Sequence, residues 1–461
     1  MNKKTFIIAS SCILTSSVFA TSFSQNVSNT NEYTNEFEFI KESETDRVNR
    51  LTNLDHKLLF TKEIEDLNGR KLCFFAFDKS VASIVDKSTL ITLQTDFLDY
   101  KSISNKTNLI YLPADGVYER KDSNTLENVI SKKNIEINSA VDNVLKLWFP
   151  KSSEIKNEQM AKRKLEKSVK TKMRSNKFNE TWNTYLNDNW QPYDFKNQRV
   201  PGVSHITPNS WWWASRTGYK RIGYYDYEGH TNDTGACDFI AFQNLVLYNE
   251  IFNFSNIFTD ELYNEYFTED TYNKIVPQKN KLGRYSGPVY KYAYNQYNPE
   301  ILPKTLGHKL YELADYNHHF WNGQTMVKMF DKLVSGRRIK ENYKTATKYG
   351  GFWQAYNTVR NQNRPAILAF GYVRESWGHA FVAYGYDDNS DQFLVTSLWG
   401  QEKTSCTLIS YYLHPVGSYY FDIIPQGNVT NNLQRKAFNW DNKSYTALEF
   451  KELIKNGKIK L

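Results

Sequence analysis

The segment from 237 to 252 is apolar on nearly every side of a helix, and this constrains the fold more than any other feature. Its large apolar side chains come in runs that leave no wide polar face: Phe239, Ile240, Phe242, Leu245, Val246 and Leu247. Such a helix is stable only when other elements cover it on several sides. With 461 residues, 40% of them hydrophobic, the chain is long enough to build those layers.

The residues that follow change from helical patterns to strand patterns. Helices are expected over 303–316, 323–333 and 351–360. Strands are expected over 366–372, 380–386, 392–398, 407–413 and 419–424, with a turn at 387–390. Helices followed by an antiparallel sheet predict an α+β fold, with the helix at 237–252 in the centre.

The N-terminus has the order of residues found in a secretory signal. Lys3 and Lys4 precede an apolar stretch over 6–14, and a cleavage-type sequence ends at Ala20. We therefore expect the protein to be secreted or associated with the cell surface. Stable membrane insertion is not expected, because no other run approaches about 18 apolar residues.

The rest of the chain divides where its composition changes. Polar residues dominate first, then short apolar runs between turn residues, then a Lys- and Arg-rich stretch, and then an aromatic region that opens at Pro201. These changes predict a signal peptide over 1–20, a flexible leader over 21–50, a small α/β N-terminal domain over 51–150, a basic helical linker over 151–200, a second domain over 201–425 and a C-terminal tail over 426–461.

Two residues within the second domain carry the chemistry. Cys237 lies in the first turn of the central helix, where unpaired amides and the helix dipole favour the thiolate. A cysteine beside a buried helix is also a common packing residue, so the helix alone does not decide its role. His379 lies at the start of an apolar strand, and a thiol and an imidazole together predict nucleophile and general base.

A third group is expected to orient the imidazole. If the hairpin turns near Asn389, the residue opposite His379 is about 399. Ser397 is the first choice for the orienting residue, and Thr396 and Gln401 are the alternatives. The acidic residues of the turn lie at the far end, on the order of 25 Å away, and are not expected to orient the ring: Asp387, Asp388 and Asp391.

Three segments resemble papain-superfamily cysteine peptidases, and most of all the exported cysteine peptidases of mollicutes: 235–237, 378–386 and 395–400. The separation of 379 − 237 = 142 residues falls within the roughly 130 to 150 described for papain-like enzymes. The resemblance covers about 203–424 and implies a central helix plus antiparallel sheet, with Cys237 as nucleophile and His379 as general base. Asn232 would help the Cys237 amide to stabilise the oxyanion. The segments depart from the family pattern where Asp238 replaces Gly and Thr396 and Ser397 replace Asn.

The resemblance implies hydrolysis of a protein or peptide substrate through a thioester, with 51–150 acting as a propeptide or inhibitory lid. The rival function is that of an exported adhesin or ligand-binding protein on a catalytically dead peptidase fold. No cofactor or metal is expected, because HExxH and CxxC patterns are absent. The net charge of +8 is interleaved with acids and does not indicate a nucleic-acid partner. Cys73 and Cys406 lie in strand-like runs and are expected to be packing residues.

Overall fold

The computed structural model describes residues 29–97, 100–113, 116–130, 132, 134–137, 153–170, 200, 202–209, 213, 237–271, 286–292, 294, 298–315, 323–371, 378–396, 407–413 and 418–458. The chain divides into two compact units, Met1–Ile40 and Lys41–Leu461. The described part of the first unit is the beginning of helix α1 (Asn29–Thr52), and the second unit holds all the other described elements. The expected signal peptide over 1–20 lies outside the described residues.

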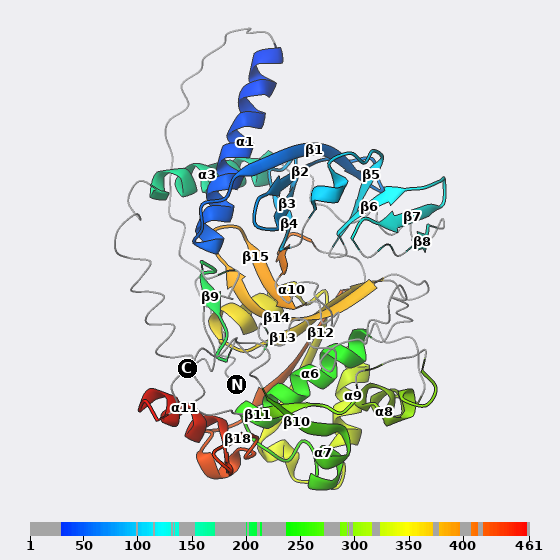
Figure 1. The fold of residues 1–461 in the computed structure, drawn as a ribbon, viewed down its shortest axis with the longest axis vertical. Coiled ribbons are helices and arrows are strands. Elements are labelled where there is room, and N and C mark those ends of the chain that lie inside the picture. The colour runs from blue at the N-terminus through cyan, green and yellow to red at the C-terminus, as the bar shows by residue number, and fades with distance from the viewer. Residues whose placement is uncertain are drawn as a thin grey trace, which may run out of the picture. The chain divides into compact units, whose positions relative to one another are not determined.

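Most of the described strands belong to one fifteen-stranded sheet (Figure 1). They are β1 (Leu58–Asp66), β2 (Lys71–Phe77), β3 (Val81–Asp86), β4 (Thr92–Asp96), β5 (Leu109–Leu112), β6 (Gly116–Arg120), β7 (Thr125–Asn128), β8 (Asn134–Glu136), β9 (His205–Ile206), β12 (Tyr343–Tyr349), β13 (Ala366–Gly371), β14 (Gly378–Asp387), β15 (Gln392–Thr396), β16 (Thr407–Ser410) and β17 (Tyr419–Pro425). Their order is β12-β17-β13-β14-β15-β16-β4-β3-β2-β1-β5-β6-β7-β8, and β9 pairs with β14. The β1–β5 pair is parallel, and the strands that surround β14 are antiparallel.

The helices and a smaller sheet complete the described structure. The remaining α-helices are α3 (Ser153–Lys170), α6 (Cys237–Phe252), α7 (Asp260–Tyr266), α8 (Leu306–Leu313), α9 (Gly323–Leu333), α10 (Phe352–Tyr356) and α11 (Ala447–Lys455). Short 3₁₀ segments are η1 (Lys101–Ile103), η4 (Leu302–Lys304), η5 (Ile339–Glu341) and η7 (Asn431–Leu433), and η6 (Asn357–Asn361) is a π-helix. The smaller sheet has the order β10 (Phe267–Thr271), β11 (Ser286–Tyr290), β18 (Phe438–Trp440) and β19 (Lys443–Tyr445).

The helices and strands expected between 237 and 424 are confirmed. Helices α6 and α9 have the expected bounds, α8 occupies the middle of the expected helix, and α10 with η6 covers 352–361. Strands β13 to β17 occupy the five expected strand segments, with shifts of up to three residues at their ends. The α+β fold class is therefore confirmed.

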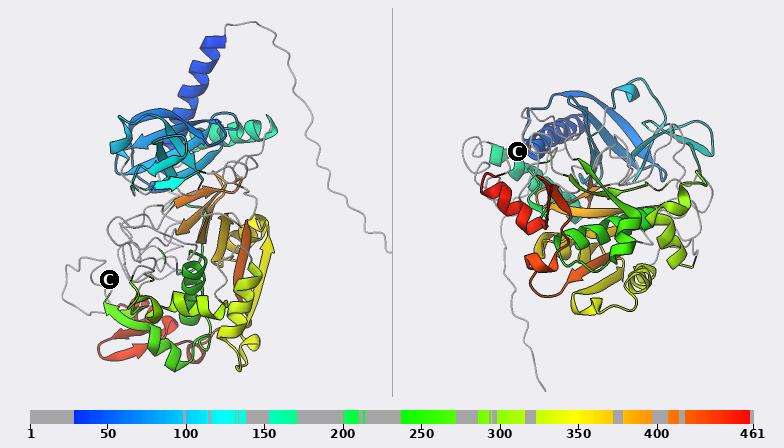
Figure 2. Two further views of the ribbon diagram at one scale, coloured as in Figure 1. Left: turned by 90° about the vertical axis from the view of Figure 1, so that its right-hand side faces the viewer. Right: turned by 60° about the horizontal axis from the view of Figure 1, so that its bottom comes forward.

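Helix α6 lies against β13, β14 and β17 (Figures 1 and 2). All sixteen of its residues are buried, as its apolar sequence predicts. The Phe242 ring packs on Phe421 of β17, with ring centroids 5.6 Å apart. The opposite face of these strands packs against α10 and η6, where Phe352 and Val359 share a core cluster with Phe381. The central strands are thus covered on both faces.

The strands that precede residue 201 continue the sheet of those that follow it. Strand β16 pairs with β4, with Leu408 opposite Thr95. One hydrophobic cluster also contains buried residues from both segments, including Ile110, Leu112, Phe381 and Phe393. The expected N-terminal domain and the expected second domain therefore share hydrogen-bonded strands and a core.

Helix α1 occupies residues that the composition assigned to a flexible leader. Glu44 and Arg47 are buried, and the Arg47 Nε donates to Glu44 Oε1 at 2.9 Å. Val48 and Leu51 are fully buried as well. A polar composition predicts disorder because charged side chains usually stay in water, whereas these charges are paired inside the fold.

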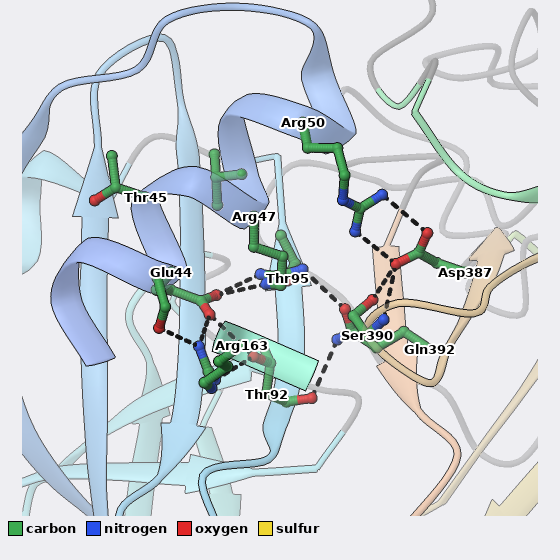
Figure 3. A network of polar contacts seen from close by, with 12 residues as sticks. Glu44, Thr45, Arg47, Arg50, Thr92, Thr95, Arg163, Asp387, Ser390 and Gln392 are labelled. Carbon is green, nitrogen blue, oxygen red and sulfur yellow. Dashed lines mark hydrogen bonds and ion pairs between the residues drawn. The ribbon is translucent and has the colours of Figure 1, made fainter. Parts of the chain in front are cut away.

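Figure 3 shows the polar network around Glu44. Arg163 of α3 donates to Glu44 Oε2 at 3.0 Å, and the Arg47 Nη1 donates to Oε1 of Gln392 in β15 at 3.0 Å. Residues 153–170 are helical, as expected for the basic linker, but Gln159 and Arg163 are both buried. The network thus joins α1, α3 and β15.

The expected C-terminal tail over 426–461 contains folded structure. Strands β18 and β19 extend the smaller sheet, and α11 follows them. Phe438 and Phe450 are fully buried, and their rings stack with centroids 5.2 Å apart. The short strands alternate with polar turn residues, so the segment has little hydrophobic periodicity of its own.

Candidate active site

Cys237 is the first residue of α6 and is only 3% exposed. The predicted position of the thiol in the first helical turn is confirmed. Backbone N–H groups in a first turn carry partial positive charge, and this favours a thiolate. Cys73, by contrast, lies in β2, and burial raises the pKa of its thiol to about 11. Neither Cys73 nor Cys237 forms a disulfide bond, and Cys406 lies outside the described residues.

His379 is the second residue of β14 and is 6% exposed. Its ring lies 6.2 Å from the Phe381 ring, centroid to centroid. Alternation along a strand places these two side chains on one face, and Phe381 belongs to the cluster that α10 covers. Helix α6 packs on the other face. A contact between Cys237 and His379 therefore has to form around the beginning of β14, and this contact remains a prediction.

The first turn of α6 lies at the end of the sheet that carries His379. Tyr419, at the start of β17, is opposite Ala369 of β13, which is opposite Ala380 of β14. The Tyr419 hydroxyl donates a 2.5 Å hydrogen bond to Oδ1 of Asp238. The hydrogen bond thus connects Asp238, which follows Cys237, to Tyr419, which lies in register with Ala380, the neighbour of His379.

Asp238 is the functional candidate that the sequence analysis noted only as a departure from a family pattern. It is completely buried, and its burial raises the pKa of the carboxyl to about 7, although the Tyr419 hydrogen bond acts in the opposite direction. An acid in the first turn of a largely apolar helix was the available signal. Its partner could not be inferred, because Tyr419 lies 181 residues away.

The β14–β15 hairpin that follows His379 has the predicted register, which is centred on Asn389. Val382 pairs with Thr396, and each lies seven residues from Asn389 (389 − 382 and 396 − 389). A bulge between Ala383 and Gly385 makes this register possible, because it adds one residue to β14. Among the candidates for the orienting residue, Thr396 is the last residue of β15 and is 4% exposed. The other two candidates, Ser397 and Gln401, lie outside the described residues, and so does Asn232.

The acids of the hairpin turn have structural partners. Asp387 accepts two hydrogen bonds from Arg50, and Asp388 accepts two from Arg360, at 2.6 and 2.9 Å. Burial opposes ionisation of Asp387, but the Arg50 guanidinium outweighs it and lowers the pKa of the carboxyl. Asp391 pairs with Lys162. Their expected role as turn acids agrees with these contacts.

The described part of the chain contains no group of three or more His, Cys, Asp or Glu side chains that could hold a metal ion. None of the described helices is both long and apolar enough to cross a membrane.

Known proteins offer little similarity to this chain. No family model matches it, and no curated protein does. Among solved structures it is similar to a fragment of prointerpain A from Prevotella intermedia, with 10% sequence identity and a TM-score of 0.28. The match covers 78% of this chain and 98% of that chain. This is a weak structural similarity.

Proposed function

We propose that the protein is an exported cysteine peptidase with a papain-like arrangement, in which Cys237 is the nucleophile and His379 the general base. The observation that carries the proposal is the location of a buried thiol at the start of a buried helix that packs on an antiparallel sheet. Strand β14, against which α6 packs, carries the buried His379 imidazole at its second residue. A helix N-terminus and a histidine base are the groups that activate a cysteine nucleophile.

The reaction proceeds in two displacements. His379 takes the proton of the Cys237 thiol. The sulfur then forms a bond to the scissile carbonyl carbon, and the carbonyl electrons move to its oxygen, near the Cys237 amide and Asn232. The C–N bond then breaks, and the leaving amine takes a proton from His379. Water attacks the thioester carbonyl carbon as it gives a proton to His379. The C–S bond then breaks, the acid product leaves, and the sulfur takes the proton back from His379. Ser397 orients the imidazole throughout.

The N-terminal segment constrains how such an enzyme would be activated. A propeptide is lost on maturation, and loss of 51–150 would break the β4–β16 ladder and open the shared core cluster. Unpaired strand edges and exposed apolar surface are costly in water. We infer that this segment stays bound to the rest of the fold, whether or not the chain is cut.

A second candidate function rests on exposed aromatic side chains. Trp353 is 60% exposed and stacks on Tyr356, with ring centroids 5.2 Å apart. Tyr349 is 68% exposed. Aromatic side chains of this kind supply contact area in binding proteins. They favour the adhesin or ligand-binding alternative, in which the peptidase fold has lost its activity.

Covalent labelling separates the two candidates. The chain from Thr21 onward is treated with an epoxide inhibitor of thiol peptidases, and labelling of each cysteine is followed by mass spectrometry. We expect Cys237 to be labelled much faster than Cys73, whose pKa of about 11 leaves little thiolate at neutral pH. Cys73→Ala is the matched control and should leave labelling of Cys237 unchanged. Equally slow labelling of both thiols would favour the binding protein.

A further inference from the structure

A completely buried carboxyl group lies next to the candidate nucleophile. Oδ1 of Asp238 accepts the 2.5 Å hydrogen bond from Tyr419, and Oδ2 is buried with no hydrogen-bond partner among the described residues. A buried acceptor without a donor is costly, and the cost is much greater when the group is charged. The site therefore favours a neutral Asp238 and opposes an ionised one.

Among the described residues no cation acts on the pKa of Asp238, which burial raises and the Tyr419 hydrogen bond lowers. Strand β13 has no titratable side chain, and β17 provides Tyr419 toward α6. Asp422 and Tyr420 of β17 lie on the other face, where Asp422 pairs with Arg364. The other titratable groups on these elements are Cys237, Tyr248 and Glu250 on α6, His379, Tyr384, Tyr386 and Asp387 on β14, His308, Lys309, Tyr311 and Glu312 on α8, and Glu449, Lys451, Glu452 and Lys455 on α11.

The electrostatic environment of Asp238 and Tyr419 includes the thiol. Burial raises the pKa of Asp238 to about 7, and the negative charges of Asp238 and Cys237 both act to raise the pKa of Tyr419. Two like charges in one low-dielectric region disfavour each other. A charged Asp238 would therefore make the Cys237 thiolate harder to form.

We propose that Asp238, held by the Tyr419 hydroxyl, is a positioning residue that controls the charge beside Cys237 and admits the thiolate most readily in its own neutral form. The inference rests on the proposed role of Cys237 as the nucleophile. Thiol reactivity normally rises with pH as more thiolate forms. In this protein the rise should be smaller, because Asp238 ionises over the same pH range and its charge opposes the thiolate.

The test measures how the rate of Cys237 alkylation by iodoacetamide depends on pH in the full chain, read at the Cys237 peptide by mass spectrometry. In the unsubstituted protein we expect a broadened profile with an inflection near pH 7. Asp238→Asn should remove that inflection and raise the rate at pH 8 by up to about tenfold, which is the limit for a shift of roughly one unit in the thiol pKa. Tyr419→Phe should move the inflection to higher pH, because the lost hydrogen bond stabilised the charged form.

Asp422→Asn is the matched control, since it removes a second fully buried acid from the other face of β17. It should leave the Cys237 profile unchanged. An unchanged profile in folded Asp238→Asn would overturn the inference, and so would an unmoved inflection in Tyr419→Phe if Asp238→Asn does not fold. Alkylation needs no turnover, so a protein that shows these shifts but cleaves no peptide would contradict the proposed function and leave the Asp238 inference standing.

Discussion

Arg50 and Asp387 lie 337 residues apart in the sequence and form an ion pair with two hydrogen bonds, at 3.1 and 2.8 Å. Asp387 is completely buried at the tip of the hairpin that follows His379, and Arg50 lies near the end of α1. Together with the β4–β16 ladder, this pair fastens the N-terminal part of the second unit to the strands of the candidate active site.

Limited proteolysis should cut the chain without separating its parts. Trypsin cleavage within 171–199 is expected to yield fragments that elute together from a sizing column without denaturant, because the ladder and the Arg50–Asp387 pair do not depend on that segment. Cleavage within α3 should be slower, since Gln159 and Arg163 are buried. Fragments that separate under native conditions would contradict the inference that 51–150 stays bound.

Glu44→Gln should destabilise the fold by about 3–5 kcal/mol, because it leaves buried guanidinium groups without their counter-charge. Burial raises the pKa of Glu44, but Arg47 and Arg163 outweigh burial and lower it to about 2. Its contribution is therefore present above its ordinary pKa of 4.5 and is lost as the pH falls through about 2. Urea denaturation checks the loss, and Glu63→Gln, at an exposed ion pair, should cost less than about 1 kcal/mol.

Asp238 should make stability depend on pH in the opposite direction from Glu44. Its pKa is raised from 3.8 to about 7 in the folded chain, so the folded state holds a proton that the unfolded state has already released. Stability should fall by about 4 kcal/mol as the pH rises from about 4 to about 7. The unfolding free energy is measured at pH 4 and at pH 8 in both proteins. In Asp238→Asn the difference between these two values should lack this decline. Equal differences in the two proteins would show that Asp238 is not a buried neutral acid.

Cys237→Ala and His379→Ala should each abolish nearly all peptide hydrolysis. The double variant should be little worse than either single variant, because nucleophile and base act as a unit. Initial rates on a peptide library measure these effects, and Cys73→Ala should retain full activity. Turnover that survives in Cys237→Ala would identify a different nucleophile.

Ser397→Ala should lower kcat by on the order of tenfold, or about 1.4 kcal/mol, because an orienting residue neither attacks nor carries the transferred proton. Ser397→Asn should preserve or raise kcat. Thr396→Ala is the comparison variant, since Thr396 was the neighbouring alternative and lies buried at the end of β15. A larger loss in Thr396→Ala than in Ser397→Ala would reassign the orienting role to Thr396.

The sequence alone determined the central helix, the helices around 303–360, the five strands between 366 and 424, and the locations of Cys237 and His379 within these elements. Apolar periodicity is a local property, so runs of residues predicted α6, α9 and the strands from β13 to β17. The register of the β14–β15 hairpin was also accessible, because a short turn between two strands leaves few ways to pair them.

Only the tertiary structure decided which polar residues are paired inside the fold. The composition of α1 is that of a solvated segment, yet Glu44 is compensated by Arg163, which lies 119 residues further along the chain. Asp238 accepts a hydrogen bond from Tyr419, which lies 181 residues further along the chain. Strand β4 pairs with β16, which is separated from it by most of the sequence. Burial of a charge or of a strand edge depends on partners brought together by folding, and no local pattern of residues specifies those partners.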